Sequence, residues 1–334
     1  MSVGLDPASM KDQTEVAGDN RLMGGKRHVD PFIMALVGLL MLIVVVASIT
    51  VPGFLNPTNF TAVLQAASIT GIVAVGLTFV TISGSFVSLG TGPLAMTSAV
   101  TFAAMISGGL PLWLSLAVAL LLGCAMGAGQ GAIVALGMNP VITTLAAGAI
   151  AFGVIAALTE GRVINVSTDE LAWLGSGRPL GIPVQVFFFL ITVVLASLLA
   201  SRTVLGRSIR LVGANRAAAR ISGISRSRVV IWAFLLLGLG TTIAGVLIVA
   251  QLGQANVNTL SSLTIDAIAA VLVGGTAVAG GIGSPLRSAI GATIIALLNN
   301  TMVLVGASFG VRQLVVGTIV IAVVILLRVL GKRT

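Results

Sequence analysis

The chain has 334 residues, of which 57% are hydrophobic and only 8% are charged, with a mean hydropathy of +1.14. A soluble domain carries roughly 25% charged residues, so this composition excludes an ordinary soluble protein and indicates a polytopic membrane protein. The formal net charge of +9 comes from residues at the edges of apolar runs, which argues against nucleic-acid binding and for contact with anionic membrane lipid.

The expected fold class is an all-α bundle of integral membrane helices. The chain contains 41 glycines and many other small residues, which let helices approach one another closely in lipid. One cysteine, Cys124, and one histidine, His28, are too few for a disulfide framework or for a metal site built from these side chains.

Residues 1–30 are polar and mixed in charge, and we expect them to form a flexible cytoplasmic tail. The apolar run 31–51 is too long for the core of a signal peptide and is expected to remain as the first membrane span. A polar loop at 159–181 separates the fifth span from the sixth. With ten spans, both termini lie in the cytoplasm. The nine further spans are expected at 62–83, 86–108, 111–136, 140–158, 182–200, 229–252, 264–280, 288–308 and 312–330.

Two of these spans are interrupted by glycine and proline. Eight spans also fit if 86–108 and 264–280 are broken or re-entrant. The two halves carry similar Gly/Ser-rich breaks, SGSFVSLGTGPLAM and GGTAVAGGIGSPLRSAIG, each followed by a helix of small residues. Because the block 62–158 starts outside and the block 229–330 starts inside, the sequence is consistent with an inverted repeat, which many transporters use.

Residues 201–228 form a polar island between apolar spans. Short loops rich in lysine and arginine stay in the cytoplasm, and the expected topology places nearly all of the positive residues on that side. The centre of the island, 213–224, is Ala-rich and bounded by glycines, so we expect a short helix on the membrane surface that a cytoplasmic partner can reach. The island has no acidic residue and no lysine, and its arginines are Arg202, Arg207, Arg210, Arg216, Arg220, Arg226 and Arg228.

The sequence lacks the motifs of common soluble enzymes. It has no GxxxxGKS/T P-loop, no HExxH and no CxxC, so we expect this chain to have no ATPase site and no enzymatic activity of its own. Asp266 is the only acidic residue well inside a predicted span, and no lysine or histidine lies in one, which argues against a proton or ion pump. Energy for transport must therefore come from elsewhere, or transport is passive.

The segment from 213 to 306 closely resembles the permeases of bacterial ABC importers of the ribose, xylose, arabinose and galactose type, which are related to branched-chain amino acid permeases. The matching text is GANRAAARISGIS, LTIDAIAAVLVGGTAVAGGIGS and GATIIALLNNTMVLVG. The first half agrees more loosely, in VAVGLTFVTISGSFVSLGTG and NPVITTLAAGAIAFGVIAALTEGRVI, and the spacing agrees over 32–330.

The resemblance implies a permease domain at 31–334 with a cytoplasmic coupling loop at 201–228. It further implies a homo- or heterodimer of permease subunits, two cytoplasmic ATPase subunits that use ATP and Mg²⁺, and a periplasmic sugar-binding protein. This chain would bind no cofactor itself. It would carry a monosaccharide such as ribose, xylose or galactose across the bacterial inner membrane by alternating access.

The GxNxxAAxxSGI segment resembles the coupling helix that docks into the ATPase. Gly223 fits the position that follows a helix C-terminus, and Arg216 and Arg220 share one helix face. The family usually has glutamate near 216, so an ion pair of that glutamate is not carried over: the partner's groove has reversed charge, or the contact is lost. The expected docking residues are Gly213, Asn215, Arg216, Ala218, Ala219, Arg220, Ser222, Gly223 and Ile224.

The resemblance also suggests residues of the substrate path. The family's first-half motif reads close to GGIDLSVG, whereas this chain has SGSFVSLG, so Val87 stands at the usual acidic position. The substrate is then unusual, or a second, non-identical permease supplies the missing group. The candidate path residues are Gly84, Ser85, Ser88, Gly90, Asp266, Asn299 and Asn300.

Each path candidate also has a purely structural interpretation. The glycines of 84–92 are equally consistent with close helix packing. Asp266 is expected to cap the start of the 264–280 helix. Asn299 and Asn300 are expected to form hydrogen bonds between helices.

Other functions remain open at this point. Within the same class, the cargo could be a nucleoside, an autoinducer-like sugar derivative or a branched-chain amino acid. A secondary carrier or passive facilitator would work alone and without ATP. A membrane scaffold would move no substrate even with every partner present.

Overall fold

The computed structural model describes residues 31–166 and 169–331. The chain divides into two compact units, Met1–Ala35 and Leu36–Thr334, and the helical bundle described below lies in the second, apart from the first residues of its first helix. The tail expected at 1–30 lies outside the described residues.

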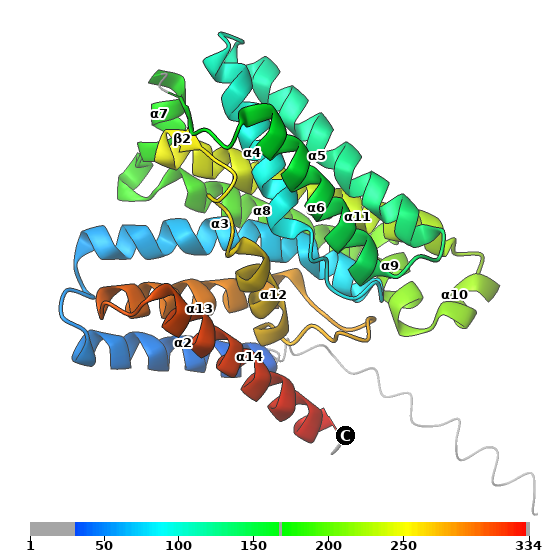
Figure 1. Ribbon diagram of the computed structural model, residues 1–334. Coiled ribbons are helices and arrows are strands. Elements are labelled where there is room, and N and C mark those ends of the chain that lie inside the picture. The colour runs from blue at the N-terminus through cyan, green and yellow to red at the C-terminus, as the bar shows by residue number, and fades with distance from the viewer. Residues whose placement is uncertain (1–30, 167–168, 332–334) are drawn as a thin grey trace, which may run out of the picture. The chain divides into compact units, whose positions relative to one another are not determined.

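The elements follow one another along the chain as Figure 1 shows. The helices are α2 (Pro31–Thr50), α3 (Pro57–Ile82), α4 (Thr91–Ser107), α5 (Leu112–Ala135), α6 (Pro140–Thr159), α7 (Asp169–Ser176), the 3₁₀ turn η1 (Pro179–Gly181), α8 (Val184–Arg202), α9 (Val204–Ala214), α10 (Arg216–Ile221), α11 (Arg226–Leu252), α12 (Leu263–Val273), α13 (Pro285–Leu304) and α14 (Phe309–Gly331). Two short strands, β1 (Ile164–Asn165) and β2 (Gln254–Ala255), pair with each other.

Among the described residues, α2, α3, α5, α6, α8, α11 and α13 are long and apolar enough to cross a membrane, while α4, α12 and the searched part of α14 are shorter apolar helices. These ten helices correspond one by one to the ten predicted spans. The predicted all-α membrane bundle is therefore confirmed.

The two spans that were expected to be interrupted are shortened in the structure. α4 begins only at Thr91 and α12 already ends at Val273, so the predicted bounds 86–108 and 264–280 are each wrong at one end. Phe86 (φ 60°) and glycines in both breaks have positive φ, which an α-helix excludes. The break at 83–90 therefore separates α3 from α4, and the break at 274–284 separates α12 from α13.

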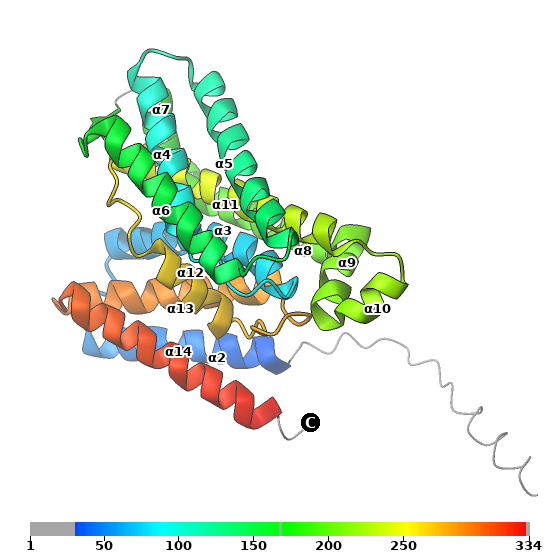
Figure 2. The same cartoon turned by 45° about the vertical axis from the view of Figure 1, so that its right-hand side comes forward.

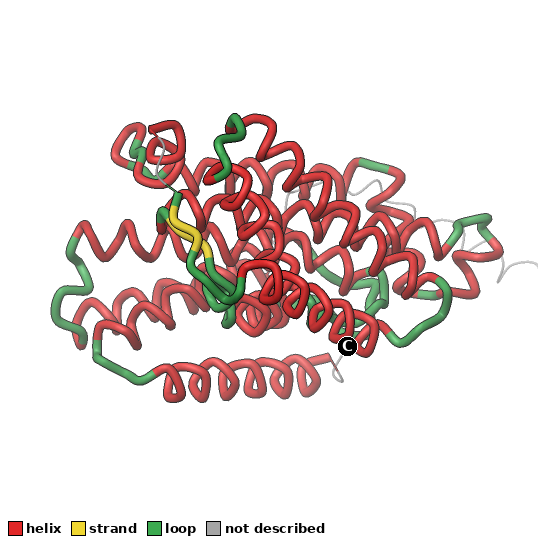
Figure 3. Tube along the Cα trace, turned by 45° about the horizontal axis from the view of Figure 1, so that its top comes forward, coloured by secondary structure: helices red, strands yellow, loops and turns green. Residues whose placement is uncertain are grey.

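The polar loop predicted at 159–181 contains β1, α7 and η1, so the expectation of a plain loop is wrong there. β1 pairs antiparallel with β2, with Ile164 opposite Ala255. Figure 3 shows this pair as two short yellow stretches of the tube among the red helices. It connects the first half of the chain to the second at the end of α11.

Local signals explain where two of the long helices begin. Asn56 caps α3 and Asn139 caps α6, each through its side-chain oxygen, and a proline occupies the first helical position after each cap. Asparagine accepts a hydrogen bond from the unpaired N–H groups of the first turn, and proline has no N–H to leave unpaired.

The packing of the helices is that of an inverted repeat. α3 packs against α11, α12 and α13, and α11 packs correspondingly against α3, α4 and α5. The contacts α4–α5, α4–α6 and α5–α6 likewise have counterparts in α12–α13, α12–α14 and α13–α14. Replacing α3–α6 by α11–α14 therefore turns one half of the contact pattern into the other.

The two repeats run in opposite directions. Gly84, just after α3, and Arg226, at the start of α11, line one cavity. Ala62, near the start of α3, and Gln251, near the end of α11, line another. α3 and α11 are thus antiparallel, and they lie side by side in Figures 1 and 2.

The largest contact between two helices, that of α5 with α11, is made at glycine residues. A Cβ atom at Gly127 would overlap the carbonyl oxygen of Phe234 and lie 3.1 Å from Gly238 Cα, so the two backbones touch. Lipid does not drive helices together as water does, and such close backbone packing is what stabilises helix pairs in membranes.

We predict that Gly127→Ala destabilises the protein by about 1–3 kcal/mol, because the added methyl group forces the two backbones apart. Gly129→Ala is the matched control: it lies on the same helix with nothing within 4 Å of its Cβ position, and alanine is the better helix former. Thermal unfolding in detergent should show a lower Tm for Gly127→Ala only. Equal Tm values would contradict the packing argument.

Candidate functional site

Four glycines from three distant segments meet at one point of the bundle, which we call the glycine junction: Gly84, Gly213, Gly280 and Gly281. The N–H of Gly281 donates a hydrogen bond to the carbonyl oxygen of Ile82 (2.8 Å). A Cβ atom at Gly213 would lie 2.6 Å from Gly281 N, and one at Gly280 would lie 2.7 Å from Gly84 Cα. Both helix breaks and the end of α9 are therefore in direct backbone contact.

α9 lies against the bundle as an amphipathic helix. Its buried residues are Gly206, Ile209 and Val212, while Arg207 is exposed and Arg210 is half-buried. Gly213 belongs to the last turn of α9, so the expectation that it bounds the short docking helix is wrong. Its small size serves the glycine junction instead.

The docking segment is a separate short helix, α10, closed at both ends. The side-chain oxygen of Asn215 accepts hydrogen bonds from the N–H groups of Ala217 (3.0 Å) and Ala218 (3.1 Å). At the other end, the N–H of Gly223 donates a hydrogen bond to the carbonyl oxygen of Arg220, and the N–H of Ile224 donates one to the carbonyl oxygen of Ala219. Gly223 has φ 73°, which confirms the predicted position after the helix C-terminus.

Most of the predicted docking residues are accessible. Ala219 alone is buried within α10, whereas Arg216, Ala218, Arg220 and Ser222 are exposed. In Figures 1 and 2 α10 lies at the periphery of the bundle. The sequence analysis missed Ile221, which is 89% exposed at the end of α10. The sequence did offer a sign of this, because Ile221 is an apolar residue between the polar Arg220 and Ser222.

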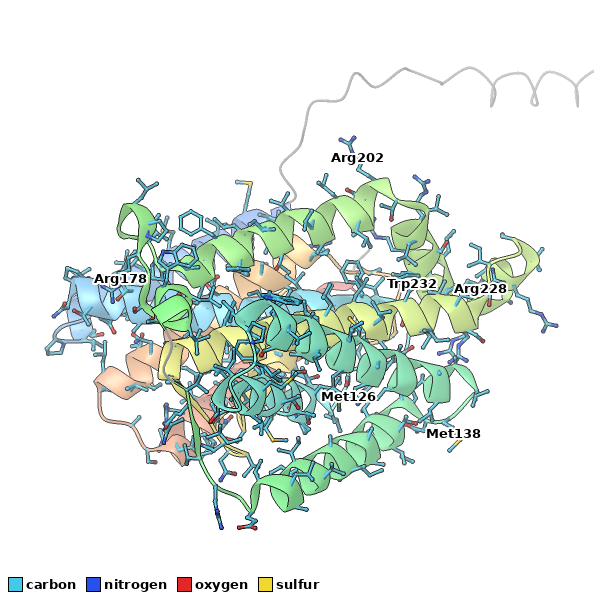
Figure 4. The ribbon with its side chains drawn as sticks, turned by 90° about the horizontal axis from the view of Figure 1, so that it is seen from above. Met126, Met138, Arg178, Arg202, Arg228 and Trp232 are labelled. Atoms are coloured by element: carbon cyan, nitrogen blue, oxygen red, sulfur yellow. The ribbon has the colours of Figure 1, made fainter. Side chains whose placement is uncertain are left out.

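A cavity of about 540 Å³ opens beside α10, and we call it the Arg216 cavity. Arg216 donates a hydrogen bond from Nη2 to the carbonyl oxygen of Gly84 (2.9 Å), which ties α10 to the break after α3. The cavity is lined by Gly84, Ser85, Phe86, Gly137, Met138, Asn139, Pro140, Val141, Arg216 and Arg226. Figure 4 shows Met138, which lines this cavity, and Arg228, in the first turn of α11, at one end of the bundle. Arg178, just before η1, lies at the opposite end.

The second cavity, of about 380 Å³, contains Asp266, and we call it the Asp266 cavity. The carboxylate is only 8% exposed and accepts a hydrogen bond from Asn299 Nδ2 (3.1 Å). Asn300 Nδ2 donates to Asn59 Oδ1 (2.9 Å). The hydrogen bonds between helices expected for Asn299 and Asn300 are thus confirmed. Ser262, not Asp266, holds the capping position of α12, so the capping interpretation is wrong.

The structure therefore divides the predicted path residues. Asp266, Asn299 and Asn300 come together in one cavity, and Gly84 and Ser85 line the other. Sequence reasoning missed polar residues that share the Asp266 cavity, because each lies at a helix end that looks unremarkable by itself: Gln251, Arg312 and Gln313.

The remaining two path candidates line neither cavity. Ser88 is buried and its hydroxyl has no hydrogen-bond partner among the described residues. A Cβ atom at Gly90 would lie 2.6 Å from the carbonyl oxygen of Thr144, so this glycine serves close packing, as the structural interpretation expected. Val87, at the position where the resemblance led us to expect an acidic residue, is 6% exposed.

Comparison with known proteins agrees with this architecture. The family model described as the permease component of branched-chain amino acid transport systems matches residues 59–327. The ribose import permease protein RbsC of Escherichia coli is 39% identical over 302 residues, covering 89% of this chain and 92% of that protein. The ribose import permease of Haemophilus influenzae is 36% identical, with coverages of 87% and 90%.

Two further similar proteins are a permease for another sugar and a solved ABC transporter structure. The galactofuranose transporter permease protein YtfT of Escherichia coli is 33% identical over 265 residues, covering 79% of this chain and 77% of that protein. A solved inward-facing structure of a metal-chelate type ABC transporter superposes with a TM-score of 0.50 at 18% identity, covering 88% of this chain and 99% of that one. At this identity the structural match supports the fold alone.

The predicted resemblance is confirmed, since the family model covers most of the chain and several relatives exceed 30% identity over most of its length. The chain belongs to the permease components of bacterial ABC importers, in the family that contains the ribose import permeases and is related to branched-chain amino acid permeases, and it is a multi-pass membrane subunit rather than an enzyme.

Proposed function

We propose that this chain imports a monosaccharide of the ribose type across the bacterial inner membrane. The observation that carries the proposal is its 39% identity to a ribose import permease over 89% of its length. The Asp266 cavity supports it, because a carboxylate and carboxamides can bind sugar hydroxyls through several hydrogen bonds.

The energy for import comes from a partner in this proposal. Two cytoplasmic ATPase subunits bind ATP and Mg²⁺, a second permease copy completes the membrane path, and a periplasmic sugar-binding protein delivers the substrate. α10 docks into the ATPase through its exposed residues. Support comes from the caps at both of its ends and from its accessible position.

The proposed coupling runs through the glycine junction. Movement of α10 is transmitted through Arg216 to the carbonyl oxygen of Gly84 and through Gly213 to Gly281. These contacts reach both helix breaks. α4 begins just after the first break, and α12 ends just before the second. Closely packed backbones pass on a displacement because they leave no free volume to absorb it.

The α10 end of the bundle faces the cytoplasm in this proposal, with both termini on that side, because the arginines of 201–228 keep it there. We predict that Ser222→Cys, in a Cys124→Ala chain, is labelled by a membrane-impermeant maleimide only after spheroplasts are permeabilised. Ser176→Cys, at a position in α7 that is also exposed, should be labelled in intact spheroplasts. The reverse pattern would overturn the orientation.

We predict that Gly223→Pro abolishes ATP-driven uptake in proteoliposomes and releases the ATPase during purification. Proline cannot adopt φ 73° and removes the N–H that closes α10. Gly306→Pro is the matched control, because Gly306 (φ 74°) closes α13 with the same two hydrogen bonds at the other end of the bundle.

This experiment also separates the competing classes. The importer requires the ATPase, ATP and the binding protein for uptake of radiolabelled ribose. Uptake by the chain alone, without ATP, would favour a stand-alone carrier. No uptake of any sugar, nucleoside or branched-chain amino acid in the complete system would favour a scaffold.

We predict that Asp266→Asn lowers uptake about tenfold or more if the carboxylate binds the sugar, because a hydrogen bond to a charged group contributes about 1.5–3 kcal/mol. The amide oxygen of the variant can still accept the hydrogen bond from Asn299, so the helix contact should persist. Normal uptake at an unchanged Tm would assign Asp266 a structural role only.

A further inference from the structure

Two arginine side chains of different helices meet at the Arg216 cavity. Arg216 is the first residue of α10 and Arg226 is the first residue of α11, and both line the cavity wall. Because both side chains line this one cavity, their positive charges lie near each other. Two like charges that face one cavity repel each other unless an anion lies between them.

The part of the chain that the structure describes supplies no such anion nearby. The sequence has no acidic residue between Glu170 and Asp266. Among the acidic side chains that the structure describes, Glu160 pairs with Arg162 and Asp266 lines the other cavity. The charge of the two arginines is therefore not neutralised by the described part of the chain.

Hydrogen-bond donors in this cavity are also unused. The Nε atom of Arg226 is buried and has no hydrogen-bond partner among the described residues. Arg216 has five donor N–H groups, and one of them is directed to the carbonyl oxygen of Gly84. A buried donor without a partner costs free energy, so an acceptor that enters the cavity and pairs with Arg226 Nε would be stabilised there.

We propose that the Arg216 cavity receives an acidic side chain of the partner ATPase when α10 docks. A carboxylate has two oxygens that match the planar fork of a guanidinium, and two arginines can hold it from two sides. The volume of about 540 Å³ admits a whole side chain. This inference rests on the proposed docking of α10.

The position of the cavity favours a protein carboxylate over a dissolved anion or a lipid phosphate. One of its walls is Arg216, on the same short helix as the exposed Arg220 and Ile221. A partner that covers α10 therefore also covers the cavity. The same docking event would bury Ile221 and neutralise the charges of Arg216 and Arg226.

The test is retention of the cognate ATPase by the full-length permease in detergent, measured as an apparent Kd. The variants are Arg216→Gln, Arg226→Gln and their combination. Arg207→Gln is the matched control, because it removes the same charge from the same loop at an exposed position that does not line the cavity. Each variant must keep the wild-type Tm to be interpreted.

We expect each cavity variant to weaken retention about tenfold or more, as for other hydrogen bonds to charged groups, with Arg207→Gln close to wild type. The double variant should lose less than the product of the two single effects, because both arginines bind one carboxylate. A further variant, Arg226→Glu, reverses the charge in the cavity. It should bind again to an ATPase in which lysine replaces the acidic residue that enters the cavity.

Three other outcomes have distinct meanings. If wild type retains the ATPase and all variants bind it equally, the inference fails and the docking of α10 stands. If wild type never retains the ATPase, the proposed function fails as well. If inorganic phosphate, or vesicles of phosphatidylglycerol but not phosphatidylcholine, stabilise the permease alone and the double variant abolishes this, the cavity is a site for a free anion or a lipid headgroup.

Discussion

The arrangement of this permease depends on direct contact between backbones at glycine. At the glycine junction, Gly84, Gly213 and Gly281 bring the two helix breaks and α9 to within van der Waals distance, and the contact between α5 and α11 at Gly127 follows the same rule. In lipid, burial of apolar surface does not distinguish one helix contact from another. Shape and backbone hydrogen bonds therefore decide which helices meet.

The inverted repeat gives these contacts their symmetry. Because α3–α6 and α11–α14 are antiparallel copies, each end of the bundle has a cavity built from corresponding elements. The two cavities nevertheless differ chemically: one contains a buried carboxylate with amide partners, the other two arginines. This chemical difference is consistent with the roles that we propose for the two ends, sugar transfer at one and ATPase docking at the other.

Local sequence signals predicted much of this structure, and tertiary contacts account for the errors. Long apolar runs located the ten apolar helices of the described residues, and Gly223 marked the end of α10, because these properties depend only on neighbouring residues. Gly213 was misassigned as a helix boundary and Asp266 as a cap, because their partners, Gly281 and Asn299, are far away in the sequence. No pattern in a single sequence reveals such pairs.

The closed ends of α10 have a consequence for the kinetics of assembly. Asn215 and Gly223 satisfy the terminal backbone groups from within the segment, so α10 does not need a partner to be helical. A segment that folds on binding loses conformational entropy at that moment, whereas a preformed one loses little. An ATPase that releases and rebinds the permease would then meet the same shape each time, and its association rate would be limited by encounter rather than by folding.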